Sequence, residues 1–219
     1  MNRLMKIFLI VIAPIMAVSL AYLGVKTLDT NLAGWFLLLM SVAYILGIPL
    51  YFWKKRGEPR ARREETGDRS FWLVQPGFLI AIFGAPIEYL FLPGLLPRVI
   101  WMQVIGLLML GISVALHSWA RQAIRGQFSG HLQIQPEHRL VKNGPYRYIR
   151  HPAYLGYLLM ALGIAISYSS LISIGAVLVL LLPGLAYRMR VEEKLLAHEF
   201  GDEYQVYAQK TQHLIPGLW

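Results

Sequence analysis

The sequence predicts an all-α integral membrane protein with about six transmembrane helices. Of its 219 residues, 56% are hydrophobic and only 15% are charged, whereas ordinary soluble domains carry about 25% charged residues. Several stretches are long and nearly free of charge, and a helix needs roughly 20 apolar residues to cross the hydrocarbon core of a bilayer. Composition and run length together exclude a water-soluble globule.

The apolar runs define the expected helices in order. The last run is too long for one crossing and carries a polar Ser167-Tyr168-Ser169-Ser170 stretch near its middle, so we interpret it as two short spans joined by a tight turn. Glu88 is the one acidic residue inside a run, and its position near the outer end favours a structural role. The runs are residues 7–25, 32–53, 71–97, 99–120 and 153–187.

The first run is expected to be a retained anchor, because it exceeds the ~7–15 residues of a signal-peptide core and no small-residue cleavage site follows it. Six crossings put both termini and the main loops on one side of the membrane. All lysines and arginines fall on that side except Lys26 and Arg98, which identifies it as cytoplasmic. Topology and contact with anionic membrane lipids therefore explain the net charge of +9, and no nucleic-acid partner is needed.

The cytoplasmic loop 121–152 is too rich in specific residues to be a plain connection. Glycines, prolines and an Asn143-Gly144-Pro145 turn prevent one continuous helix. Pro152 suits the first position of the next helix, with His151 at its N-cap. Such a helix start attracts a carboxylate or phosphate, and Arg150 and Tyr154 would cluster there. The plainer alternative is that these side chains only anchor the helix at the lipid headgroups.

Metal and thiol chemistry are not expected. The chain has no cysteine, which removes disulfides and thiolate ligands. His131, His138 and His151 are spaced unlike any zinc signature. His117 lies inside an apolar run and is expected to be a packed core residue.

The tail 188–219 begins as a polar helix directly after the last apolar run. Arg188 and Glu192 are four residues apart and share a helix face, with Glu193 beside them. Gly201 is expected to end this helix, and a capping box from Asp202 would open a second short one. An amphipathic helix on the bilayer surface is one interpretation. The other interpretation is a functional site, because acidic groups at membrane depth usually have a function.

Two motifs in these segments resemble the isoprenylcysteine carboxyl methyltransferase family, part of a wider group of integral-membrane methyltransferases that includes phospholipid methyltransferases. The resemblance covers roughly residues 131–217. It rests on His138-to-Gly156, HRLVKNGPYRYIRHPAYLG, and on RMRVEEKLLAHEFGDEYQVY followed by IPG. It implies S-adenosylmethionine as cofactor, held in a cytoplasmic pocket that the C-terminal helices cap.

The resemblance also assigns roles to residues of this chain. Arg188 would contact the acceptor, and Glu192 would hold the cofactor, so these two form the expected catalytic pair. A family glutamine corresponds to Gln133, with Gln135 as the alternative. The remaining cofactor residues would be His138, Arg139, Leu140, Val141, Tyr146, His151, Pro152, Ala153 and Tyr154.

The expected function is therefore methylation of a lipophilic small-molecule or lipid-anchored acceptor, with O-methylation of a carboxylate favoured. Residues 1–120 would form a four-helix transmembrane part that shapes the acceptor channel. Residues 121–219 would form the catalytic part, with the cofactor loop, a transmembrane hairpin and the C-terminal helices. Phospholipid N-methylation and thiol S-methylation are the alternative reactions. A small membrane transporter is the alternative of another class, although its usual signature of paired charges within spans is missing.

Overall fold

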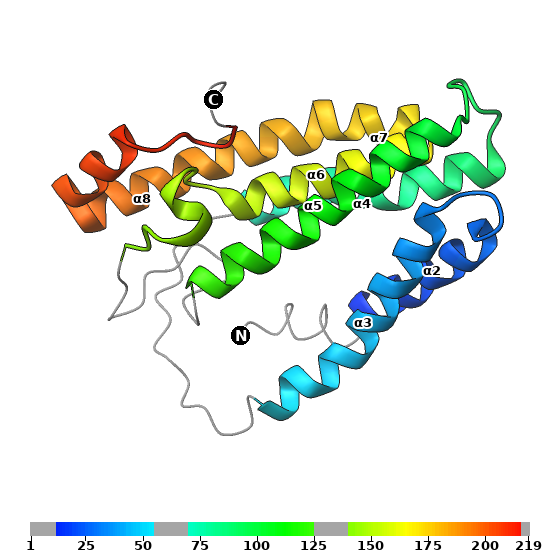
Figure 1. The fold of residues 1–219 in the computed structure, drawn as a ribbon, viewed down its shortest axis with the longest axis horizontal. Coiled ribbons are helices and arrows are strands. Elements are labelled where there is room, and N and C mark those ends of the chain that lie inside the picture. Colours follow the sequence, from blue (N-terminus) through cyan, green and yellow to red (C-terminus); the bar gives the residue numbers. More distant parts are fainter. Residues whose placement is uncertain (1–11, 55–69, 125–139, 216–219) are drawn as a thin grey trace.

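The computed structural model describes residues 12–54, 70–124 and 140–215, and all regular elements within these ranges are helices (Figure 1). The elements, in order, are α2 (Ala13–Thr27), α3 (Ala33–Lys54), α4 (Ser70–Phe91), α5 (Ile100–Ile124), η2 (Gly144–Arg147), α6 (Pro152–Ser167), α7 (Leu171–Ala176), η3 (Val177–Leu181) and α8 (Leu182–Gln209). The last three follow one another without a loop and form one long rod.

The helices have the length and composition of a membrane protein. Three of them are long and apolar enough to cross a bilayer: Leu73–Phe91, Ile100–Ile124 and the rod Leu171–Gln209. Three shorter apolar helices accompany them: Ala13–Thr27, Ala33–Gly47 and Pro152–Ser167. The all-helical membrane class is thus confirmed, and the count of six crossings stays a prediction.

The tight turn expected in the long apolar run is present. Helix α6 ends at Ser167, Ser169 adopts a positive φ of 53°, and the Ser170 side chain accepts a hydrogen bond from the Ser173 amide at the start of α7. Two contacts tie this turn to the α2–α3 connection: Tyr168 shares a 2.8 Å hydroxyl hydrogen bond with Thr27, and Asn31 donates to the Ser167 carbonyl at 2.8 Å. The chain reversal is therefore a packed part of the bundle.

Glu88 has the structural role expected for it, at the same end of the bundle. Its carboxylate is only 5% exposed and accepts hydrogen bonds from the Ser170 hydroxyl at 2.5 Å and from the Leu171 and Ile172 amides at 3.2 and 2.9 Å. These amides belong to the first turn of α7, which has no intrahelical acceptors for them. Glu88 therefore caps α7 from the neighbouring helix α4.

Helices α5 and α6 pack closely because two glycines face each other. A Cβ atom at Gly106 would lie 2.5 Å from the Gly163 carbonyl oxygen, and one at Gly163 would lie 2.9 Å from the Gly106 carbonyl oxygen. Small residues permit such backbone approach between helices in a membrane. His117 lies on the same interface, edge-on to the Tyr157 ring at 4.8 Å, which agrees with its expected place in the core.

The two ends of the bundle differ in character. The connections 28–32, 92–99 and 168–170 gather at one end, whereas residues 140–151 and the far part of α8 lie at the other (Figure 1). Gly201 interrupts α8 with φ 50° and ψ −126°, so the expected helix break is confirmed. Beyond Gln209 the chain turns back toward the start of α6 (Figure 1).

We expect Glu88→Ala to destabilise the fold, because the substitution leaves a buried helix start and the Ser170 hydroxyl without their acceptor. Loss of a hydrogen-bonded charge at such a site costs about 2 kcal/mol. The measurement is the thermal unfolding midpoint in detergent, with alanine at the exposed Glu199 as the matched control. An unfolding midpoint for Glu88→Ala equal to that of the wild type would contradict the capping role.

Candidate functional site

The segment before α6 brings several polar residues to one helix start. Gly144 adopts a positive φ of 60° at the expected Asn143-Gly144-Pro145 turn, and the η2 helix follows it. His151 is the N-cap of α6 and Pro152 occupies its first turn, as expected. The Tyr154 and Leu155 amides both donate to the His151 carbonyl at 3.1 Å. Pro152 has no N–H, so Ala153 supplies the remaining amide of this turn.

Arg188 lies where the rod changes from apolar to polar. Its side chain is 6% exposed, and its Nε donates to the Tyr154 hydroxyl at 2.8 Å. The apolar residues Leu185 and Met189 beside it are almost fully buried. A buried guanidinium held by a tyrosine at this level can orient a carboxylate brought in from the lipid side.

His151 lies between the two adjacent carboxylates of α8. Its Nε2 is 3.1 Å from Glu193 Oε1, and its Nδ1 is 3.6 Å from Glu192 Oε2. The imidazole also stacks on the Tyr154 ring, with 5.4 Å between centroids and 17° between planes. The predicted helix start and the predicted acidic pair therefore meet through one histidine.

The electrostatics of this contact favour a charged histidine. Burial lowers the pKa of His151, but hydrogen bonds and charges from Glu192 and Glu193 outweigh burial, and the net pKa is raised. Burial disfavours the charged form of Glu193 on α8. Hydrogen bonds and charges from His151 and Arg150 outweigh burial and lower the pKa of Glu193 to about 2. The contact thus favours the charged form of His151 beside the carboxylates.

Two buried polar atoms lie near this cluster: the Tyr204 hydroxyl oxygen, which has no hydrogen-bond partner among the described residues, and Glu192 Oε2, whose contact with His151 Nδ1 is long at 3.6 Å. Burial raises the pKa of Tyr204, and the nearby charges of Glu193 and Glu192 raise it further. Buried polar atoms in folded proteins are normally paired. Glu192 and Tyr204 therefore suit a ligand that offers hydroxyl or amino groups.

The structure brings together seven of the residues expected from the sequence: Tyr146, His151, Pro152, Ala153, Tyr154, Arg188 and Glu192. Tyr146 belongs to this group because burial, and then the Glu192 charge, raise its pKa. Leu140 and Val141 are half-buried at the beginning of the same segment. The remaining predicted residues of this loop lie outside the described residues: Gln133, His138 and Arg139, together with Gln135, His131, Gly126 and Gly130.

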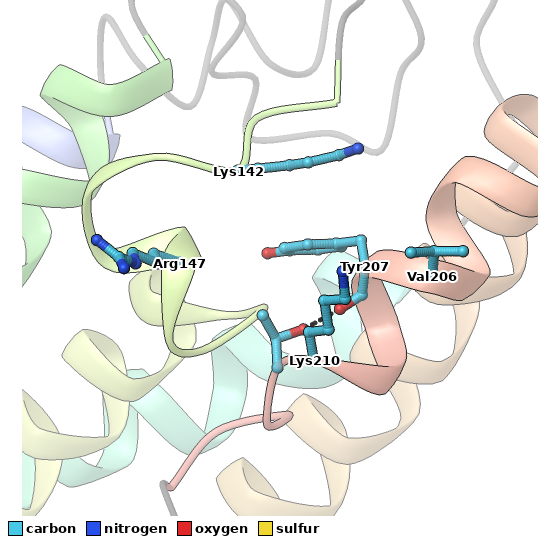
Figure 2. A pocket seen from close by; sticks show the side chains of 6 residues that line it. Lys142, Arg147, Val206, Tyr207 and Lys210 are labelled. Atoms are coloured by element: carbon cyan, nitrogen blue, oxygen red, sulfur yellow. Dashed lines mark hydrogen bonds between the residues drawn. The ribbon is translucent and has the colours of Figure 1, made fainter.

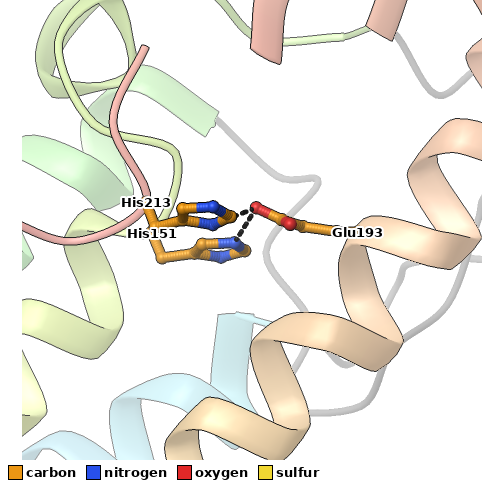
Figure 3. A group of neighbouring side chains, drawn as sticks. All are labelled: His151, Glu193 and His213. Carbon is orange, nitrogen blue, oxygen red and sulfur yellow. Dashed lines mark hydrogen bonds and ion pairs between the residues drawn. The ribbon is translucent and has the colours of Figure 1, made fainter. Parts of the chain in front are cut away.

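Sequence reasoning missed the part that the C-terminal tail plays here. Glu193 Oε1 accepts from Arg150 Nε at 2.8 Å and from His213 Nδ1 at 2.9 Å, in addition to His151 (Figure 3). The adjacent carboxylates were visible in the sequence, but no motif connects Glu193 with a histidine 20 residues later. Arg150 also donates to the Ala208 and Thr211 carbonyls.

His151, Glu193 and His213 form the one histidine–carboxylate group in the described part of the chain that could hold a metal ion, because one ligand atom from each lies within 4.8 Å of the others. The Arg150 guanidinium, however, lies 2.8 Å from the same carboxylate oxygen. A bound cation would face this fixed positive charge. The three residues therefore belong to a hydrogen-bonded network around one carboxylate, in which the Arg150 guanidinium takes the place that a metal ion would need.

A basic pocket lies next to the cluster, between η2 and the end of α8 (Figure 2). Its volume is about 200 Å³, below the ~300–1,000 Å³ typical of small-molecule sites. The Tyr207 hydroxyl donates to the Tyr146 carbonyl at 2.8 Å and closes one side of it. The lining residues are Lys142, Arg147, Val206, Tyr207, Lys210 and Thr211.

Comparison with known proteins identifies the class to which this fold and site belong. The family described as phospholipid methyltransferase matches residues 101–203. The chain is 30% identical over 149 residues to a probable protein-S-isoprenylcysteine O-methyltransferase of Oryza sativa subsp. indica, covering 66% of this chain and 78% of the relative. It is 30% identical over 153 residues to protein-S-isoprenylcysteine O-methyltransferase B of Arabidopsis thaliana, covering 67% and 77%. These relatives show that the chain is an integral-membrane methyltransferase.

A solved structure shares this fold. A eukaryotic intramembrane Ras methyltransferase, isoprenylcysteine carboxyl methyltransferase, matches 96% of this chain and 77% of its own with a TM-score of 0.68 at 21% identity. The structural match thus extends to the N-terminal helices, which the sequence motifs do not reach. The chain belongs to the protein-S-isoprenylcysteine O-methyltransferase family.

We expect the stability of the wild type to depend on pH through His151. Its folded pKa is raised above the ordinary 6.5, so the protonated ring stabilises the fold fully below about pH 6.5, and this contribution is lost as the pH rises through the raised value. Glu193 stays ionised throughout this window. The measurement is the thermal midpoint of the wild type minus that of His151→Gln at increasing pH. A difference that stays constant would contradict the raised pKa.

Proposed function

We propose that this chain transfers a methyl group from S-adenosylmethionine to the carboxylate of a lipophilic thioether of the S-isoprenylcysteine type. The observation that carries the proposal is Arg188, which is buried and held by Tyr154 one helical turn before Glu192. A carboxylate-binding cation therefore lies at the boundary between the apolar rod and the polar cluster. A lipophilic acceptor can reach this boundary from the bilayer, and a water-soluble donor can reach it from the other side.

The residues around Glu192 fit the donor. The Tyr204 hydroxyl is buried without a partner among the described residues, and Glu192 Oε2 makes a long contact of 3.6 Å with His151. Both suit the hydroxyl and amino groups of a nucleoside and an amino acid. The Ala153 amide at the start of α6 suits the donor carboxylate. Tyr146 and Tyr154 offer aromatic faces to a sulfonium or an adenine ring. When bound, S-adenosylmethionine supplies a methyl group on a positively charged sulfur.

Further donor contacts are proposed from the family motif. Leu140, Val141, His151 and Pro152 would line the donor pocket within the described chain. Gln133 or Gln135, His138 and Arg139 would complete it from the preceding loop. The contacts of His151 with Glu192 and Glu193 also hold the end of this loop next to α8.

The acceptor side depends on orientation and exclusion of water. Arg188 would hold the acceptor carboxylate in line with the methyl group through a fork of N–H donors. Leu181, Leu185 and Met189, each at most 2% exposed, form an apolar wall next to it. Removal of water makes the carboxylate oxygen more reactive toward the methyl group. No proton has to leave a carboxylate acceptor before it reacts.

His151 favours a carboxylate over an amine as acceptor. An ammonium acceptor must lose a proton, so its methylation calls for a nearby base. His151 is the histidine at the described cluster that faces both carboxylates, with Nε2 3.1 Å from Glu193 and Nδ1 3.6 Å from Glu192. An imidazole with both ring nitrogens turned to carboxylates is poorly placed to take a proton from an acceptor. This observation favours O-methylation over phospholipid N-methylation.

We further propose the arrangement in the membrane. The end of the bundle that holds the cluster would face the cytoplasm, because residues 140–151 and the far part of α8 at this end carry Lys142, Arg147, Arg150, Lys194 and Lys210. Residues 1–120 would supply the helices around the acceptor, and residues 121–219 the donor site. Membrane lipids surround the apolar helices, whose outward side chains such as Leu39, Leu108 and Val179 are more than 60% exposed.

The activity can be tested with methyl-labelled S-adenosylmethionine and N-acetyl-S-farnesylcysteine added to the purified protein. A methyl ester releases labelled methanol in alkali, whereas an N-methyl or S-methyl product keeps its label. We expect alkali-labile label in the farnesylated product. Label that survives alkali and appears in phospholipid would show N-methylation and would overturn the proposed O-methylation. Absence of S-adenosylhomocysteine binding in calorimetry would defeat the proposal altogether.

We expect the substitutions Arg188→Ala and Glu192→Gln to separate the two half-sites. Arg188→Ala should retain S-adenosylhomocysteine binding but lose turnover with the farnesylated acceptor by roughly 100-fold, as on removal of one partner of a buried charge pair. Glu192→Gln should weaken S-adenosylhomocysteine binding. Arg190→Ala is the matched control, because Arg190 is exposed on the same helix. Full activity of Arg188→Ala would remove the proposed acceptor contact.

A further inference from the structure

The chain after α8 returns to the start of α6 and pairs with it. The Arg150 amide donates to the Gln212 carbonyl at 2.8 Å, and the His151 amide donates to the His213 carbonyl at 3.1 Å. The Gln212 amide in turn donates to the Tyr148 carbonyl at 3.1 Å, which makes a short parallel bridge between Ile149 and Gln212. The tail is therefore hydrogen-bonded directly to the residue that caps α6.

Packing fixes the tail independently of its polar contacts. Leu214 is 1% exposed and belongs to the same hydrophobic cluster as Leu158, Leu185 and Met189. Thr211 is also buried, and its hydroxyl donates to the Tyr207 carbonyl at 2.8 Å. The His213 side chain, in contrast, is 38% exposed. Substitution of His213 thus removes a polar contact while the Leu214 anchor stays in place.

The polar contact of His213 is made to the carboxylate that holds His151. His213 Nδ1 and His151 Nε2 lie 2.9 and 3.1 Å from the same Glu193 oxygen, and the two rings lie side by side (Figure 3). Arg150 occupies the remaining side of that oxygen at 2.8 Å. The position of Glu193 therefore sets the position of His151, and His213 helps to fix Glu193 from the tail.

We propose that His213 is a positioning residue for the methyl donor. By fixing Glu193, it holds His151 against Glu192, so that Glu192 Oε2 stays buried and directed to the donor. This inference rests on the proposed function, because it takes Glu192 as the donor contact. The contact of His213 runs through Glu193 to His151 and Glu192, whereas Arg188 is held by Tyr154. We expect the loss of His213 to weaken donor binding and to leave the acceptor KM near the wild-type value.

The test compares His213→Ala, His213→Asn and the control His198→Ala, at an exposed histidine of α8, in the full-length protein. Calorimetry gives the Kd for S-adenosylhomocysteine, and kinetics give separate KM values for S-adenosylmethionine and N-acetyl-S-farnesylcysteine. We expect His213→Ala to raise the donor Kd and KM about tenfold, as on loss of one hydrogen bond to a charged group. The acceptor KM and the thermal midpoint without ligand should stay at the wild-type values. The Asn side chain places an N–H donor near the former Nδ1, so His213→Asn should restore donor affinity.

The outcomes separate this inference from the proposed function. If the wild type does not bind S-adenosylhomocysteine, the proposed function fails and the inference fails with it. If the wild type binds it and His213→Ala binds it equally well, only the inference is overturned. A His213→Ala protein with a lowered thermal midpoint and equal losses for donor and acceptor would also overturn it, since His213 would then be merely structural.

Discussion

The site depends on one carboxylate oxygen that three segments share. Glu193 Oε1 lies on α8, and it accepts from Arg150 and His151 before α6 and from His213 in the tail. Three positively charged or chargeable groups around a partly buried acid offset the desolvation of that acid. This contact adds a shared side-chain link to the backbone hydrogen bonds that already join the tail to the start of α6. With it, the helix start at His151 and the second carboxylate, Glu192, are held at 3.6 Å.

The membrane explains why the site is built at a helix end. Methyl transfer here brings a lipophilic acceptor and a water-soluble donor together, and only the boundary of the apolar bundle is open to both. The rod that contains α8 reaches this boundary at Arg188, with buried Leu181 and Leu185 before it and Glu192 one turn after it. The opposite end of the bundle is instead closed by structural contacts such as Glu88 on α7. The polar groups of the proposed site and the structural polar groups are therefore separated along the helix axes.

Local sequence signals predicted much of this arrangement. The polar Ser167–Ser170 stretch predicted the chain reversal, Pro152 predicted the start of α6, and Gly201 predicted the break in α8. The four-residue spacing of Arg188 and Glu192 predicted their common face. The return of the tail could not be predicted, because the pairing of Ile149 with Gln212 joins residues distant in sequence and leaves no periodic pattern. The structural role of Glu88 was expected from its place in an apolar run. Its partners at the start of α7 could not be predicted, because they are also distant in sequence.

The central claim is that the donor binds between the start of α6 and the acidic pair of α8. The most direct measurement is an experimental structure of the protein in lipid nanodiscs with S-adenosylhomocysteine bound. The account predicts the nucleoside within hydrogen-bonding distance of the Glu192 carboxylate and on the same side as Tyr154, with Glu193 still held by Arg150, His151 and His213. A nucleoside bound elsewhere, with Glu192 and Tyr154 both free of contact to it, would contradict the account.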